Sequence, residues 1–81
     1  MIKIEVRLYA TLRRYRPELE VGEPLSLNLE EGTTVEQLLE EELGISTEVV
    51  KTIFVNGVAQ SPGYVLADAD RVGIFPPVGG G

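Results

Sequence analysis

The chain has 81 residues, of which 13 are acidic and 7 basic, giving a net charge of −6 at pH 7. A chain this short buries only about 60 to 65% of its unfolded surface, so one sheet and one or two helices are all it can pack. It has no cysteine and no histidine, which excludes disulfides, thiolate chemistry and the commonest general base and metal ligand. The negative charge argues against nucleic-acid binding and favours a basic or electropositive protein partner.

Three segments alternate apolar and polar residues, as strands with one buried face do. The N-terminal segment also lacks the apolar run of a signal peptide, and no stretch of the chain is long and apolar enough for a transmembrane span, so we expect a cytoplasmic protein with no membrane partner. The apolar positions of these strands are Ile2, Ile4, Val6 and Leu8, then Leu25, Leu27 and Leu29, and finally Val72 and Ile74. Between the first two strands, Leu12 and Tyr15 can pack in a short helical turn. Asn56-Gly57 predicts a turn between two short extended pieces.

One segment, TTVEQLLEEELG from residue 33 to 44, predicts a helix. Thr33 as N-cap and Glu36 form a capping box, and Gly44 stands where a left-handed C-cap belongs. The apolar residues at helical spacing are Val35, Leu38, Leu39 and Leu43, and the acidic run Glu40–Glu42 is interpreted as a solvated face. One helix covers one face of a sheet, so the fold class is α+β.

No cluster of side chains predicts an active site. Asp68 and Asp70 can bind a divalent cation, but they lack the further ligands of a loop site, and a polar turn is the favoured interpretation. The remaining candidate is the segment PPVGGG. Pro76 and Pro77 hold an extended exit from the last strand, and glycines without Cβ can thread a narrow channel, so the predicted division is a domain over 1–75 and an extended, flexible tail over 76–81. A disordered linker remains the alternative.

The motifs GTTVEQLL, VNG and LADADRVGIFPPVGGG resemble the MoaD/ThiS family of ubiquitin-like sulfur carriers over the whole chain. The ending FPPV, one residue before Gly-Gly, is most similar to the small subunit of molybdopterin synthase. The resemblance implies a β-grasp fold with a mixed sheet of four to five strands and one main helix on one face. Ala69 departs from the usual glycine of the family turn, and Arg7 and Ala59 stand where the molybdopterin branch tends to carry larger apolar residues.

The resemblance also implies a function without catalytic residues, bound metal or bound cofactor in this chain. The carboxylate of Gly81 would be adenylated with ATP by a partner of the MoeB/ThiF type, related to ubiquitin-activating enzymes, and become a thiocarboxylate with sulfur from a donor such as a cysteine desulfurase. The tail, formed by Pro76, Pro77, Val78, Gly79, Gly80 and Gly81, would enter the large subunit of molybdopterin synthase (MoaE type). Sulfur transfer towards thiamine or cysteine, a protein modifier joined to lysines through Gly81, and a plain binding module remain alternatives.

Family members dock through an apolar patch on the open face of the sheet. By parity, Phe75 points away from Val72 and Ile74, and Phe54 points away from Ile53 and Val55. Phe54 and Phe75 are therefore the candidates for a partner-binding patch, with a core position for Phe54 as the alternative.

Overall fold

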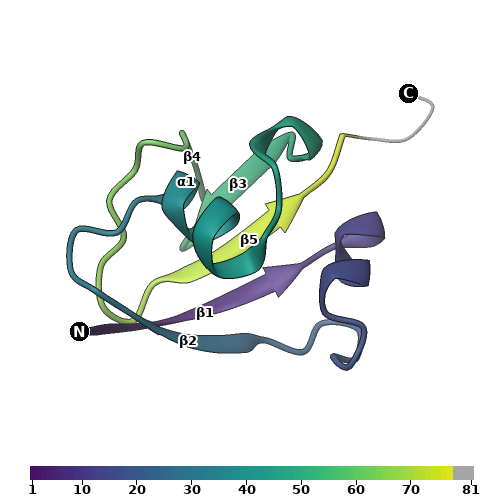
Figure 1. The fold of residues 1–81 in the computed structure, drawn as a ribbon, viewed down its shortest axis with the longest axis horizontal. Coiled ribbons are helices and arrows are strands. Elements are labelled where there is room, and N and C mark those ends of the chain that lie inside the picture. The colour runs from purple at the N-terminus through teal and green to yellow at the C-terminus, as the bar shows by residue number, and fades with distance from the viewer. Residues whose placement is uncertain (78–81) are drawn as a thin grey trace.

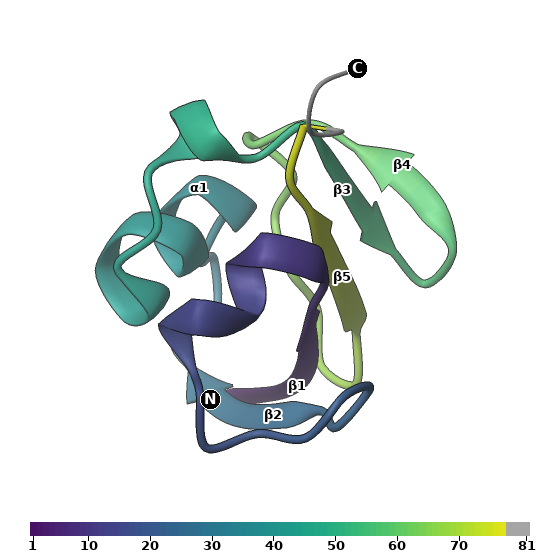
Figure 2. The same cartoon turned by 90° about the vertical axis from the view of Figure 1, so that its right-hand side faces the viewer.

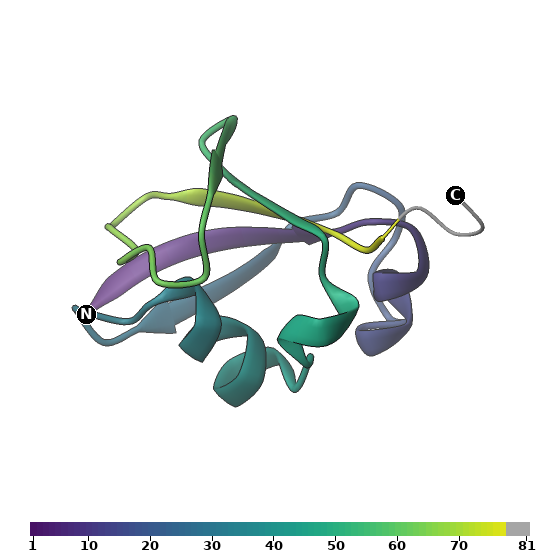
Figure 3. The same ribbon diagram turned by 90° about the horizontal axis from the view of Figure 1, so that it is seen from above.

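A computed structural model describes residues 1–77 of the chain, which form a five-stranded sheet with its helical segments packed against one face (Figure 1). The view from above shows the α1 segment below the sheet and no helix over the opposite, open face (Figure 3). The α+β prediction is therefore confirmed. In chain order the elements are β1 (Ile2–Leu8), η1 (Ala10–Tyr15, 3₁₀), β2 (Leu25–Leu29), α1 (Val35–Gln37), η2 (Leu38–Leu43, π-helical), η3 (Thr47–Val49, 3₁₀), β3 (Thr52–Val55), β4 (Val58–Gln60) and β5 (Arg71–Phe75).

The strand order is β2-β1-β5-β3-β4, with the first and last strands of the chain side by side in the middle. β1 and β5 are parallel, in a register that places Arg7 opposite Gly73 and Leu8 opposite Ile74. The other three pairings are antiparallel. Because β1 and β5 run in the same direction, the chain leaves both at the same end of the sheet, where η1 begins and the tail departs (Figure 1).

The core lies between the sheet and the helical segments. Every second residue of β1 is buried, in the alternation that the sequence predicts. Full burial of one such aliphatic side chain contributes about 1.5–3 kcal/mol, so this layer dominates the stability of the domain. Its largest fully buried side chains are Ile4, Val6, Val35, Leu38, Leu39, Ile45, Val72 and Ile74. Leu12 of η1 is also buried, and Tyr15 packs against the cluster, as predicted for this short helical turn.

The helix begins one residue later than the sequence predicts, so the capping box of Thr33 and Glu36 is wrong. Thr34 is the N-cap: its hydroxyl oxygen accepts from the Gln37 N–H at 3.2 Å, and the Gln37 side-chain oxygen accepts from the Thr34 N–H at 3.0 Å. The Thr33 hydroxyl donates to the Glu30 carbonyl instead. The sequence fits a capping box that starts at Thr33 and equally one that starts at Thr34. The bridge between Thr34 and Val65, in the loop before β5, favours the box that starts at Thr34.

The second half of the helix is π-helical, where the sequence predicts regular α-helical winding. The N–H groups of Gly44 and Ile45 both reach back to the Leu39 carbonyl, the latter at 2.8 Å. Gly44 has φ 70° and ψ 28°, which confirms the left-handed C-cap. The Arg16 guanidinium donates to the Glu42 carbonyl at 3.2 Å, so a cation meets this C-terminal end despite its acidic sequence. No helix within residues 1–77 has the length and apolar character needed to cross a lipid bilayer.

The turn before β5 uses its two carboxylates as hydrogen-bond acceptors for the backbone and for Asn56. Asp70 is 5% exposed; its oxygens accept from the Asn56 side-chain amide and the Ala67 N–H, both at 2.8 Å. Asp68 accepts from the Lys3 N–H at 2.8 Å. No group of three or more histidine, cysteine or acidic residues suited to a metal ion occurs in residues 1–77. Both aspartates therefore act in the structure of the turn, as the favoured interpretation predicts.

We expect Ala69→Gly to stabilise the protein by about 0.5–1 kcal/mol, because Ala69 has φ 72° in the left-handed region, where a Cβ is unfavourable. Urea unfolding measures the change. Ala67→Gly is the matched control: Ala67 lies two residues earlier in the same exposed turn without a positive φ, so glycine there is expected to destabilise. Equal effects of both substitutions would contradict this account of Ala69.

Candidate functional site

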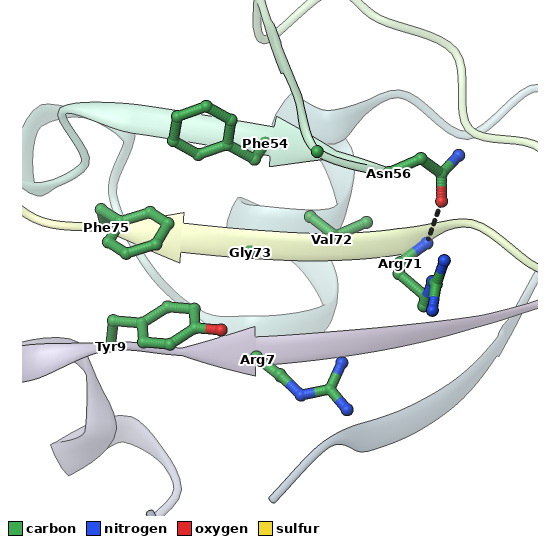
Figure 4. Close-up of a pocket in the computed structure, with 9 residues that line it drawn as sticks. Arg7, Tyr9, Phe54, Asn56, Arg71, Val72, Gly73 and Phe75 are labelled. Carbon is green, nitrogen blue, oxygen red and sulfur yellow. Dashed lines mark hydrogen bonds between the residues drawn. The ribbon is translucent and has the colours of Figure 1, made fainter. Parts of the chain in front are cut away.

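The open face of the sheet carries a shallow hollow of about 400 Å³ over the C-terminal end of β1, the whole of β5 and the end of β3 (Figure 4). Most of its walls come from alternate residues of these strands, whose neighbours in sequence point into the core, and the rest from buried Val72 and from the turn after β3. The lining residues are Arg7, Tyr9, Phe54, Asn56, Gly57, Arg71, Val72, Gly73 and Phe75. The hollow has aromatic side chains at one end and cationic side chains at the other (Figure 4).

Three rings form the aromatic end. Tyr9 and Phe75 are stacked, with ring centroids 4.3 Å apart and planes 1° apart. Phe54 meets Phe75 edge to face, with centroids 5.6 Å apart. Both phenylalanines are half-buried on the open face, as their parity predicts, and the alternative that Phe54 belongs to the core is wrong. Tyr9 was not predicted as part of this group, because the sequence does not reveal that β1 pairs with β5.

Gly73 forms the floor of the hollow between its two ends. A Cβ at this position would lie 3.4 Å from Cε2 of Tyr9 and 3.5 Å from Cε1 of Phe75. These are ordinary van der Waals distances, so a small side chain would fit without disrupting the strand, but it would fill the floor. Glycine therefore keeps the middle of the hollow open.

The cationic end consists of Arg7 and Arg71, held beside the β3–β4 turn. The Asn56 side-chain oxygen accepts from the Arg71 N–H at 3.0 Å, while the Asn56 side-chain amide donates to Asp70. Arg7 Nε donates to the Gly22 carbonyl at 3.2 Å. Asn56 has φ 53°, which asparagine tolerates in a hairpin turn. This network fixes where β5 begins relative to the hairpin and thereby the position of Arg71.

The chain leaves the sheet next to the aromatic end of the hollow. The Tyr9 N–H donates to the Ile74 carbonyl at 3.2 Å, and the Lys51 N–H donates to the Phe75 carbonyl at 2.8 Å. β5 ends at Phe75, and Pro76 and Pro77 follow without regular secondary structure. Since proline has no N–H, neither residue can continue the ladder. The other predicted tail residues, Val78, Gly79, Gly80 and Gly81, lie outside the described residues, so insertion of the tail into a partner stays a prediction.

The hollow combines aromatic rings with hydrogen-bonding side chains. Within residues 1–77, the hollow is lined by arginine, asparagine and aromatic side chains, without a serine, lysine or carboxylate that could act as nucleophile or base. β5, which carries Arg71, Gly73 and Phe75 of the hollow, lies between β1 and β3 (Figure 2).

Comparison with known proteins shows the family of the chain. Residues 6–81 match the model of the ThiS family. The chain belongs to the ThiS family. It is thus a member of the MoaD/ThiS group of ubiquitin-like sulfur carriers, as its motifs indicate. A search of curated protein sequences found no match.

Solved structures similar to this ThiS-family chain share its whole fold. One is a putative molybdopterin converting factor, subunit 1, from Pyrococcus furiosus, with 29% identity, a TM-score of 0.73 and coverage of 96% of this chain and 100% of that chain. Another is small archaeal modifier protein 1 from Haloferax volcanii, with 21% identity, a TM-score of 0.74 and coverage of 96% and 100%. The ubiquitin-like β-grasp fold is therefore confirmed.

We expect Asn56→Asp to destabilise this ThiS-family protein by about 2 kcal/mol at neutral pH, because it replaces the amide that donates to buried Asp70 with a second carboxylate. Chemical denaturation measures the loss. Asn28→Asp is the control: Asn28 is exposed in β2, with no side-chain hydrogen bond to other residues in 1–77, and its substitution is expected to stay within about 0.5 kcal/mol. Equal stability of the two variants would refute the structural role assigned to Asn56.

Proposed function

We propose that the chain is a sulfur carrier whose terminal glycine, Gly81, becomes a thiocarboxylate that supplies sulfur in molybdopterin (molybdenum or tungsten cofactor) biosynthesis. The observation that carries the proposal is the match to the ThiS family over residues 6–81, a range that includes the whole Gly79–Gly81 end. The end of β5 at Phe75, directly before Pro-Pro, supports it, because a chain that cannot continue the sheet is free to reach another protein.

The chemistry needs only the chain end and partner enzymes. A carboxylate is a poor electrophile, so one oxygen of Gly81 attacks the α-phosphorus of ATP, and pyrophosphate leaves. The resulting acyl adenylate has a good leaving group, and the persulfide of a donor protein such as a cysteine desulfurase displaces AMP at the carbonyl carbon to give an acyl disulfide. A thiol then attacks the donor-side sulfur of this disulfide, which releases the thiocarboxylate of Gly81 and leaves a disulfide between the thiol and the donor. The absence of cysteine and histidine from this chain suits the role of a substrate carried between enzymes.

The partners in this proposal are an adenylating enzyme of the MoeB/ThiF type and a large subunit of the MoaE type. The molybdopterin branch is favoured by the ending FPPV before the glycines and by the similarity to the Pyrococcus furiosus protein, which is described as a putative molybdopterin converting factor. In this branch the tail enters the large subunit, which supplies the catalytic residues. We place the docking surface on the aromatic end of the hollow, at Phe54 and Phe75, because it lies next to the residues from which the tail departs.

Intact-mass measurement after incubation with the adenylating enzyme, ATP and a sulfur donor tests the proposal. The mass of the chain is expected to rise by the difference between a sulfur and an oxygen atom, and a chain lacking Gly80 and Gly81 is expected to show no rise. An unchanged mass of the full chain, with the enzyme active on its own substrate, would contradict the sulfur-carrier function. Conjugates of higher mass that require Gly80 and Gly81 would instead support a protein modifier, the activity in the name of the Haloferax volcanii protein.

The same assay tests the docking surface with two matched variants. Phe75→Ala removes the ring that contacts both Tyr9 and Phe54, so KM for the adenylating enzyme is expected to rise about 10-fold with kcat little changed. Val58→Ala is the control, since Val58 is 58% exposed and lies outside the hollow. Equal KM values for the two variants would show that the aromatic end is not part of the interface.

A further inference from the structure

We propose that Arg7 and Arg71 form a carboxylate-binding site at the cationic end of the hollow, so that the partner docks with an acidic side chain between them and an apolar side chain on the rings. The inference rests on the proposed function and identifies the chemistry of the partner surface. It concerns the local charge of the hollow, which is opposite to the charge of the whole molecule.

The charge of the hollow is opposite in sign to the net charge of the chain. The chain carries a net charge of −6, yet two arginines and no carboxylate line the hollow within residues 1–77. The overall charge predicts basic partners, whereas the hollow presents cations. Because nearby charges dominate at contact distances and more distant ones are screened by salt, the local sign decides what binds in the hollow.

Arg7 and Arg71 lie close together on neighbouring strands. Arg7 is the direct register partner of Gly73 on the neighbouring strand, and Arg71 lies two residues before Gly73 on the same face. With strands about 4.8 Å apart and a rise of about 3.3 Å per residue, the two Cα atoms are about 8 Å apart. Gly73 contributes no side chain, so the space beside both arginines stays open, and Figure 4 shows the two side chains at the same end of the hollow. Two forked guanidinium groups at this spacing can share one carboxylate.

The guanidinium groups of Arg7 and Arg71 make few interactions within the part of the chain that the structure describes. In the described range 1–77, the Arg71 guanidinium has neither a hydrogen-bond acceptor nor a carboxylate within ion-pair distance. Arg7 meets Glu5 at 3.9 Å between half-exposed side chains, a contact of little strength, and uses Nε for the Gly22 carbonyl. The Arg71 guanidinium is therefore available to a carboxylate from outside, and within residues 1–77 the Arg7 guanidinium is held only by this long, half-exposed pair and by its Nε bond.

The cationic end of the hollow adjoins its aromatic end. The rings of Phe75, Phe54 and Tyr9 offer an apolar surface next to the cations, so an aliphatic side chain beside an aspartate or glutamate satisfies the whole hollow. A nucleic acid would bring its phosphates against a molecule of net negative charge. An acidic and aliphatic segment of the adenylating enzyme is the occupant that fits both ends.

Binding to the adenylating enzyme, measured by calorimetry at several NaCl concentrations, tests the site. Arg7→Ala and Arg71→Ala are each expected to weaken Kd about 10-fold and to reduce its dependence on salt. Lys3→Ala is the matched control: Lys3 is an exposed cation on the same strand and face as Arg7, about 13 Å away and outside the hollow, and its Kd is expected to stay within about 2-fold. Melting temperatures within about 3 °C of the parent establish that the variants fold.

The double variant Arg7→Lys with Arg71→Lys separates charge from shape. It keeps both positive charges but loses the planar forks, so Kd is expected to lie between those of the parent and the double alanine variant, with the salt dependence retained. A double alanine variant that binds like the parent, with the same dependence on salt, would overturn the proposal. If wild type forms the thiocarboxylate and the arginine variants bind equally well, the carrier function stands and only this site fails.

A peptide probe tests the site without any sulfur chemistry. The acetylated and amidated peptide Asp-Asp-Leu-Phe is titrated into isotope-labelled protein and compared with Asn-Asn-Leu-Phe. We expect the acidic peptide to shift the side-chain Nε–H signals of Arg7 and Arg71 and to bind at least about 5-fold more tightly at low salt. Equal affinity of the two peptides, or shifts confined to other surfaces, would contradict carboxylate binding whatever the fate of Gly81.

Discussion

The parallel pairing of β1 with β5 is the interaction on which the rest of the structure depends. It joins the two ends of the chain in the middle of the sheet and buries alternate residues of both strands against the helix. The same register places Arg7 beside Gly73, and the contact continues past the strands as Tyr9 stacks on Phe75. A slip of one residue would exchange the faces of a whole strand. Core, hollow and tail exit therefore share one structural cause.

The two faces of the sheet differ in what they contribute: one face stabilises the fold, and the other is open to contact. One face meets the helical segments, and its aliphatic side chains are almost completely buried. The other has no helical cover within residues 1–77, so its half-buried rings, half-buried Arg7 and exposed Arg71 contribute less to folding and remain available for contact (Figure 3). Substitutions of exposed side chains on the open face are therefore expected to cost little stability.

Local patterns in the sequence predicted what is local in the structure. Alternation located β1, β2 and β5, and Asn56-Gly57 located the hairpin. The helix was found, but its capping residue was not, because two overlapping capping patterns fit and a bridge to distant Val65 decides between them. The π-helical winding was also missed, since leucines four apart suit either winding. Parity places Phe54 and Phe75, whereas Tyr9 and the arginine pair require the register between β1 and β5, whose paired residues are 66 positions apart, and no local pattern encodes that register.

The most direct test of the account is a map of the surface that binds the adenylating enzyme, obtained by adding the unlabelled enzyme to the ¹⁵N-labelled chain. The account predicts that backbone signals of Phe54, Gly73 and Phe75 lose intensity first, while those of Glu36 and Glu40 on the exposed side of the helix persist to higher enzyme concentration. Loss concentrated at Glu36 and Glu40, with the three residues of the hollow unchanged, would contradict docking through the open face.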